Sequence, residues 1–355
     1  MTSKEAGDEG VSNAPTSTSA NFVVSLDFEL FWGIRDHTDL EACKTRLRGT
    51  RDAIPRLLDL FARQHIHATW ATVGFLFFDE KDELLAHLPP IKPSYRNQHL
   101  SPYHNLESIG PNEHRDPYHY GRSLIRRISE CPGQEIGTHT FSHYYCLEEG
   151  QTIDQFRADL EAAHAAARLL GIDVRSLIFP RNQWRDEYLD MCAETGIGVV
   201  RSNEQAWMYR PGSRKANSSL KRALRLADSY VNLSGHHGAR PAPCGSGLID
   251  VPSSRFLRPF SSTLARLEPF RLQRICQSMT YAAANKRAFH LWWHPHNFGT
   301  EQDDNFRALS KILEHFRMLA DQYGMASRSM GELASDEHRP ARNGSGSTTP
   351  VASVA

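Results

Sequence analysis

The chain has no excess of charge of either sign, no paired cysteine motif and no long apolar run. Its 355 residues include 41 basic and 41 acidic side chains, so the net charge gives no indication of a nucleic-acid or anionic-membrane partner. The six cysteines are scattered without C-x-x-C spacing, which argues against a zinc–thiolate site and against a disulfide framework. The chain also lacks the run of about 18 apolar residues that a membrane-spanning helix needs.

The two ends of the chain lack the apolar content of a folded core. Residues 1–20 are rich in Ser, Thr, Gly and Ala without the apolar stretch of a signal peptide, so we predict a disordered leader. Residues 335–355 are rich in Gly, Ser and Thr, and we predict a disordered tail. Residues 21–334 are predicted to form a single domain. Because no secretion signal is found, we expect a cytoplasmic protein with reduced thiols.

Short apolar runs alternate with amphipathic segments along the rest of the chain. Residues 21–26 are typical of a buried strand, 50–64 of a helix and 67–73 of a second strand, which together predict a parallel βαβ unit. Pro55 fits this helix only if it begins near Asp52. Further strands are predicted at 134–137, 176–179, 198–202, 248–252, 288–293 and 324–330, and further helices at 121–130, 152–170, 185–195, 267–284 and 306–319. Seven or eight such repeats favour one α/β barrel over two domains.

Two segments break this alternation. Residues 79–119, after the second strand, are rich in Pro, His, Asn and Tyr, and a connection of this length is usually functional or disordered. Its aromatic and polar side chains suit contacts with a sugar or peptide, but a loosely packed surface excursion fits equally well. Residues 204–247 are irregular apart from a basic helical piece at 220–226. The basic side chains there could meet a phosphate, although a solvated face is their more usual role; they are Lys215, Lys221, Arg222 and Arg225.

Polar side chains follow four of the predicted strands at their carboxyl ends, where α/β proteins place their chemistry. Asp27 and Glu29 follow the first strand and point to the same side in extended geometry. His139 and His143 follow the third strand and would face the same way if the backbone turns helically there. Two imidazoles and a carboxylate hold a zinc-like cation and leave room for water. The other strand-end candidates are Arg181, His294 and His296.

Each of these residues has an ordinary structural interpretation when taken alone. The acids could cap a turn, the histidine pair could be hydrogen-bonded, Arg181 could form a salt bridge, and His294 could lie in the core beside Trp292 and Trp293. Their joint placement at successive strand ends favours a functional site.

The motifs resemble, in this order, those of the polysaccharide deacetylase family, which is carbohydrate esterase family 4 and carries the nodulation-factor deacetylase homology domain. The segment H-T-F-S-H, from His139 to His143, matches the family motif H-[S/T]-x-x-H. The segment S-L-D-F-E-L resembles the first motif, with Phe28 in place of the usual second aspartate. Pro180-Arg181 resembles the third motif, and L-W-W-H-P-H-N-F-G contains the histidine of the last.

The resemblance implies a fold and a set of roles. The fold would be a distorted (β/α)7 barrel, a single domain with a long insertion after strand 2. Glu29, His139 and His143 would hold a divalent metal ion, most often zinc, with cobalt, nickel or manganese as alternatives. The implied catalytic residues are Asp27 as the general base, His294 as the general acid and Arg181 as the residue that orients Asp27.

The implied activity is hydrolysis of an N-acyl group, acetyl or formyl, from an amino sugar. We expect a cytoplasmic precursor of a surface polysaccharide, nucleotide-linked or lipid-linked, because no secretion signal is found. Trp184, His296 and Asn297 are candidates for contacts with this substrate. Two alternatives stay open: a hydrolase of a small non-sugar amide or cyclic imide, and a non-catalytic binding barrel, which the Phe28 departure favours.

Overall fold

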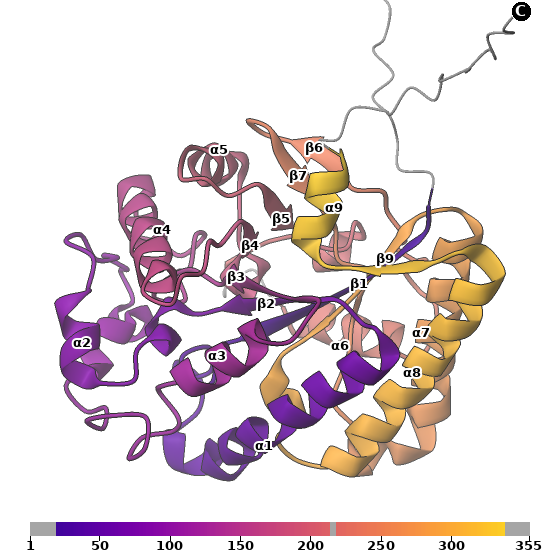
Figure 1. Ribbon diagram of the computed structural model, residues 1–355, viewed down its shortest axis with the longest axis horizontal. Coiled ribbons are helices and arrows are strands. Elements are labelled where there is room, and N and C mark those ends of the chain that lie inside the picture. Colours follow the sequence, from indigo (N-terminus) through magenta and orange to yellow (C-terminus); the bar gives the residue numbers. More distant parts are fainter. Residues whose placement is uncertain (1–18, 214–217, 338–355) are drawn as a thin grey trace, which may run out of the picture.

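The computed structural model describes residues 19–213 and 218–337 (Figure 1). Most of the predicted leader and tail therefore lies outside the described residues. One part of the tail prediction is wrong, because helix α9 (Met330–Glu337) continues beyond the expected domain end at residue 334. None of the helices in the described residues is long and apolar enough to cross a lipid bilayer.

A single curled sheet forms the centre of the described part of the chain. Its strand order is β6-β7-β5-β4-β3-β2-β1-β9-β8, and β10 also pairs with β1. All pairs are parallel except β6–β7. The strands are β1 (Asn21–Phe28), β2 (Ala68–Thr72), β3 (Gln134–Thr138), β4 (Ser176–Ile178), β5 (Val199–Arg201), β6 (Ala242–Cys244), β7 (Leu248–Asp250), β8 (Arg255–Phe256), β9 (Ala288–Trp293) and β10 (Ala326–Arg328).

One continuous segment closes the curled sheet. After β7, the amides of Val251 and Ser253 still donate to carbonyls of the β5 segment, at 2.9 Å each. From Ser254 onward the segment pairs with β9 instead, and the amides of Ser254 and Leu257 donate to it at 2.9 and 2.8 Å. β7 and β8 therefore act as one wall element, which together with β1, β2, β3, β4, β5 and β9 confirms the predicted (β/α)7 barrel.

Helices cover the outside of the sheet (Figure 1). The α-helices before α9 are α1 (Leu40–Gln64), α2 (Lys81–Ala86), α3 (Arg122–Ser129), α4 (Ile153–Arg168), α5 (Asp186–Glu194), α6 (Ser219–Asp228), α7 (Glu268–Ala284) and α8 (Gln302–Tyr323). The 3-10 helices are η1 (Gly74–Phe77), η2 (Gln98–Leu100), η3 (Pro102–Asn105), η4 (Pro180–Asn182), η5 (Trp207–Tyr209), η7 (Ser262–Leu267) and η8 (Pro295–Phe298).

The predicted start of α1 near Asp52 is wrong, since the helix begins at Leu40 and contains Pro55. Cys43 and Leu47, before the proline, lie on the same buried face as Leu58 after it. The free energy gained by this packing outweighs the loss of one helix hydrogen bond and the steric clash that a proline causes inside a helix.

The insertion after β2 packs tightly against the barrel. The indole N–H of Trp32 donates to the carbonyl of His119 at 2.8 Å, and the amide of Tyr145 donates to the hydroxyl of Tyr95 at the same distance. Tyr95 is 1% exposed. Residues 79–119 are therefore not a loose surface excursion but support the segments that follow Glu29 and His143.

The outer faces of the strands are apolar, whereas the polarity of the barrel interior changes along the barrel axis. On β1, Phe22, Val24 and Leu26 pack in the cluster that contains the helices, whereas Val23 lies in a separate interior cluster. Leu333 of α9 belongs to this interior cluster too, so α9 closes the end of the barrel at which the strands begin. The interior is thus apolar at this end and becomes polar toward the carboxyl ends of the strands.

Replacing Leu333 with Ala should test this closure. The side chain is 2% exposed, so Leu333→Ala should lower the free energy of unfolding by about 2–5 kcal/mol through lost burial and a cavity. The matched change Leu220→Ala, at a side chain 64% exposed, should stay within about 0.5 kcal/mol. Urea unfolding followed by circular dichroism measures both. Equal losses in the two variants would show that α9 does not close the barrel.

Candidate active site

Asp27 is the last inward-facing residue of β1 and forms a buried ion pair. Its two carboxylate oxygens lie 2.8 and 2.9 Å from the guanidinium nitrogens of Arg201, at the end of β5. The Arg201 guanidinium also lies over the ring of Trp292, at 4.3 Å. Burial favours the neutral acid, but the charges of Arg201, His139 and His294 outweigh it and hold the pKa of Asp27 below its usual value.

The predicted partner of Asp27 was the wrong arginine. Arg181 has a left-handed backbone (φ 55°), forms an ion pair with Asp36 and lies over the ring of Tyr145 at 4.7 Å. The orienting role expected of Arg181 therefore falls to Arg201. Arg201 follows a short apolar strand in the sequence G-V-V-R-S, so its place at a strand end was visible, but its inward direction was not.

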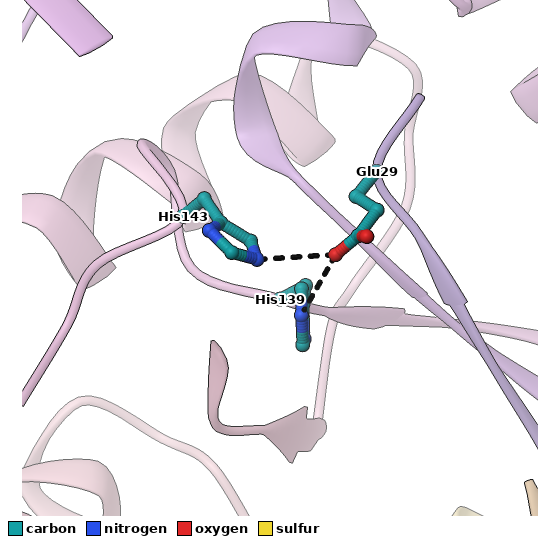
Figure 2. A group of neighbouring side chains, drawn as sticks. All are labelled: Glu29, His139 and His143. Carbon is teal, nitrogen blue, oxygen red and sulfur yellow. Dashed lines mark hydrogen bonds and ion pairs between the residues drawn. The ribbon is translucent and has the colours of Figure 1, made fainter. Parts of the chain in front are cut away.

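Glu29, His139 and His143 converge in the way a metal site requires. Their ligand atoms all lie within 4.8 Å of one another. Figure 2 shows ring nitrogens of both histidines directed at one carboxylate oxygen of Glu29, Oε2, from which the Nε2 atoms of His143 and His139 lie 3.1 and 3.6 Å away. Glu29 has room because a Cβ atom on Gly33 would lie 1.9 Å from its carboxyl carbon, so only glycine fits there.

The protonation of these residues fits a divalent cation. Nδ1 of His139 lies 2.8 Å from the carbonyl of Ile178, which fixes the proton on Nδ1 and leaves Nε2 as a ligand atom. Burial lowers the pKa of His143 to about 4, so its ring is neutral at physiological pH. Burial favours neutral Glu29, but nearby histidines, His294 first, outweigh it and hold the pKa of Glu29 well below its usual range.

The two histidines do not lie on a helical turn, so that condition of the sequence prediction is wrong. Thr140 and His143 both have positive φ, 63° and 59°, and the backbone doubles back between the ligands. Asp159 of α4 stabilises this loop by accepting hydrogen bonds from the amides of Phe141 (2.7 Å) and Ser142 (3.3 Å) and from the Ser142 hydroxyl. Sequence reasoning missed Asp159, whose only signal was an acid on the apolar face of α4.

The segment after β9 brings two more imidazoles to the site. Nε2 of His294 lies 3.7 Å from Glu29 and 3.9 Å from Asp27, and a quarter of its side chain is exposed. His296 stacks on His294 with ring centroids 4.9 Å apart and places Nδ1 3.7 Å from Glu29. Nδ1 of His296 and Nδ2 of Asn297 are buried without a hydrogen-bond partner among the described residues.

A cavity of about 810 Å³ opens above these groups. Asp27, Glu29, His143, His294 and His296 line it, and so do Asn297 and Arg181. Trp184 is not among the lining residues, but its indole N–H donates to Asn203, which is, at 3.2 Å. No described residue of 79–119 lines the cavity either, which removes the expected sugar contacts of that segment.

Comparison with known proteins agrees with the motifs and the fold. A family model described as polysaccharide deacetylase matches residues 47–200, which include His139, His143 and Arg181. A search of curated proteins found no match. A structure from Mycobacterium smegmatis assigned to the polysaccharide deacetylases is similar with a TM-score of 0.54 and 14% identity over 91% of both chains.

Two further solved structures share the fold. One, from Pseudomonas aeruginosa PAO1 and also assigned to the polysaccharide deacetylases, has a TM-score of 0.53 and 12% identity over 93% of this chain and 96% of that one. The other is Puue allantoinase, with a TM-score of 0.52 and 12% identity over 92% and 94%. At such low identity these structures show the fold alone. With the family model, they confirm the resemblance that the motifs predict.

The metal site makes a direct prediction. Protein loaded with zinc should carry about one equivalent, because two imidazoles and a carboxylate form a zinc site with room for water. His139→Ala and Glu29→Ala should each lose the bound zinc. His315→Ala should keep it, because His315 lies outside the site and contacts Thr280 at 2.9 Å. Elemental analysis after dialysis measures the ion. Stoichiometric zinc in His139→Ala would show that the ligands are assigned wrongly.

The loop that carries both histidines should depend on Asp159. Asp159→Ala removes the acceptor for two amides and a hydroxyl, so zinc affinity should fall about 10–100-fold, as when groups that orient metal ligands are lost. Asp159→Asn keeps an acceptor oxygen and should recover part of the affinity. Chelator competition measures the affinity, with circular dichroism confirming the fold. Unchanged affinity in Asp159→Ala would rule out this role.

Proposed function

We propose, from the place of this chain in the polysaccharide deacetylase family, that it is a metal-dependent hydrolase that removes an acetyl or formyl group from an amino sugar. The observation that carries the proposal is the convergence, on one cavity, of a buried carboxylate paired with arginine, a three-residue metal site and a partly exposed imidazole. These groups match the three needs of amide hydrolysis: a base, an electrophile and an acid.

Glu29, His139 and His143 would hold the cation. When bound there, a divalent ion such as zinc lowers the pKa of water and polarises the acyl carbonyl. The neutral imidazoles and the ionised Glu29 supply the ligand forms that this requires.

Asp27 would accept the proton of the attacking water. Arg201 suits it to this role by holding both carboxylate oxygens and keeping the group ionised. The buried ion pair also fixes the side chain in one rotamer, so the base does not need to be oriented during the reaction.

His294 would donate a proton to the departing nitrogen. An amine leaves poorly unless it is protonated, and His294 is the imidazole near Asp27 whose side chain reaches the open cavity. Its position 3.9 Å from Asp27 and 3.7 Å from Glu29 suits an acid that works beside the base on the same acyl group. His296 and Asn297 add unpaired polar atoms nearby and are proposed to contact the substrate or support His294.

We further propose that the substrate is a cytoplasmic precursor of a surface polysaccharide. The acyl amino sugar is the substrate class that the family match favours.

The activity is tested with zinc-loaded and cobalt-loaded protein. We expect acetate or formate to be released from one or more N-acetyl or N-formyl amino sugars, with small amides and cyclic imides assayed alongside. Faster turnover of an imide than of every sugar would overturn the substrate class. No turnover of any of these by protein with a full complement of metal would indicate a binding barrel instead of an enzyme.

Asp27→Asn separates the base from the metal site. The variant should lose at least about 10²-fold in kcat because it removes the proton acceptor, yet keep its zinc because Glu29 and both histidines are untouched. Product release measures kcat, elemental analysis the zinc and thermal unfolding the fold. His315→Ala serves as the unaffected control. An active Asp27→Asn variant would show that another group is the base.

A further inference from the structure

Part of the cavity lining, from α6 and the segment after β8, carries positive charge. Helix α6 supplies Arg222 and Arg225, and Arg258 follows β8. Arg222 and Arg225 come from the basic segment whose role the sequence left open between a solvated face and a phosphate contact. The fold decides this question in part, because it turns that face of α6 into a wall of the same cavity that contains Asp27 and His294.

The three arginines are close enough to affect one another. Burial lowers the pKa of Arg225, the nearby carboxylate of Glu204 opposes this shift, and the charge of Arg222 adds to it. Burial likewise lowers the pKa of Arg258, and the charge of Arg225 adds to the effect. Like charges gathered on one wall are unfavourable unless an anion lies between them.

Of the described carboxylates near this wall, Glu204 lines the cavity and raises the pKa of Arg225, so it offsets part of the positive charge but not all of it. Asp228, at the end of α6, accepts from Arg255 at 2.5 Å and lies 3.5 Å from Arg274, so its charge is already matched. The side-chain hydrogen bonds of Arg222 and Arg258 go to serine hydroxyls, at 3.1 and 2.9 Å. Within residues 19–213 and 218–337, no carboxylate forms an ion pair with Arg222 or Arg258.

The geometry points to a phosphate subsite: we propose that Arg222, Arg225 and Arg258 bind the phosphate of a phosphorylated N-acyl amino sugar whose acyl group lies at Asp27 and His294. Guanidinium groups bind phosphate oxygens in pairs, and several of them match a group with more than one negative charge. The cavity, at about 810 Å³, holds more than a single sugar ring. The acyl-sugar part of this inference rests on the function proposed above, whereas the phosphate part rests on the arginines alone.

Binding of inorganic pyrophosphate to the full chain tests the subsite without turnover. Isothermal titration should show binding that weakens at least about tenfold in each of Arg222→Gln and Arg225→Gln, because each loses a charged hydrogen-bond donor. Arg222 is exposed and Arg225 partly exposed, so the variants should fold, and Arg175→Gln, at an exposed arginine paired with Asp173, is the matched control. Unchanged affinity in the Arg222→Gln/Arg225→Gln double variant would overturn the proposal.

The metal site itself is the rival binding place for pyrophosphate, and His139→Ala distinguishes the two. Binding that persists in His139→Ala supports the arginine subsite, whereas binding that disappears there overturns it. Displacement of pyrophosphate by a uridine diphosphate sugar would identify a nucleotide as the source of the phosphate, and displacement by a prenyl phosphate in detergent would identify a lipid. Displacement by neither would also overturn the subsite as a substrate site.

Turnover gives an independent readout. For an N-acyl sugar that the protein hydrolyses, kcat/KM should be higher for the 1-phosphate than for the free sugar, and this ratio should fall at least about tenfold in the double variant. A ratio that the double variant does not change would overturn the proposal. If no sugar is hydrolysed, the proposed function fails, and the pyrophosphate titration still decides the phosphate subsite.

Discussion

Asp27 and Glu29 are both 3% exposed, and a buried carboxylate stays ionised only where cations or hydrogen-bond donors surround it. Arg201 supplies this for Asp27 from β5, on the opposite side of the barrel interior, and imidazoles supply it for Glu29. Because β1 alternates, Val23 and Asp27 face the same interior from opposite ends of the strand. The apolar end stabilises the barrel, and the charged end contains the chemistry.

The polar end is held together by hydrogen bonds that run along the barrel. The hydroxyl of Ser25 accepts from Arg201 at 2.9 Å and lies 2.8 Å from Nε2 of His290. His290 in turn has Nδ1 3.1 Å from the carbonyl of Val251. Contacts other than the one with Asp27 therefore also fix the Arg201 side chain. These contacts make the ion pair a rigid part of the interior.

The loop that carries the candidate metal ligands His139 and His143 is held from outside the barrel. Asp159 of α4 and the insertion that contains Tyr95 both bind the backbone around the histidine loop. This explains why a loop with positive φ at His143 is stable: the surrounding contacts fix a conformation that the residue itself does not favour. The insertion, which lines no part of the cavity among its described residues, supports the histidine loop from outside the cavity.

The sequence determined much of the architecture by itself. The alternation of apolar runs predicted the barrel and placed most strands within a few residues, because strands buried on both faces leave a continuous apolar signal. It missed β8, which has two residues, and β6, an edge strand that contains Pro243, because neither has enough residues or a regular enough pattern to be recognised. The carboxyl ends of the strands also revealed Asp27, Glu29, His139, His143 and His294.

Only the tertiary structure decided which side chains meet. Arg181 and Arg201 both follow a strand, and the sequence does not say that one turns to Asp36 and the other to Asp27. The same holds for the arginines of α6, which look like a solvated face until the fold places them on the cavity wall. Local sequence fixes the periodicity of an element, whereas the partner of a charged side chain depends on the direction in which distant elements pack.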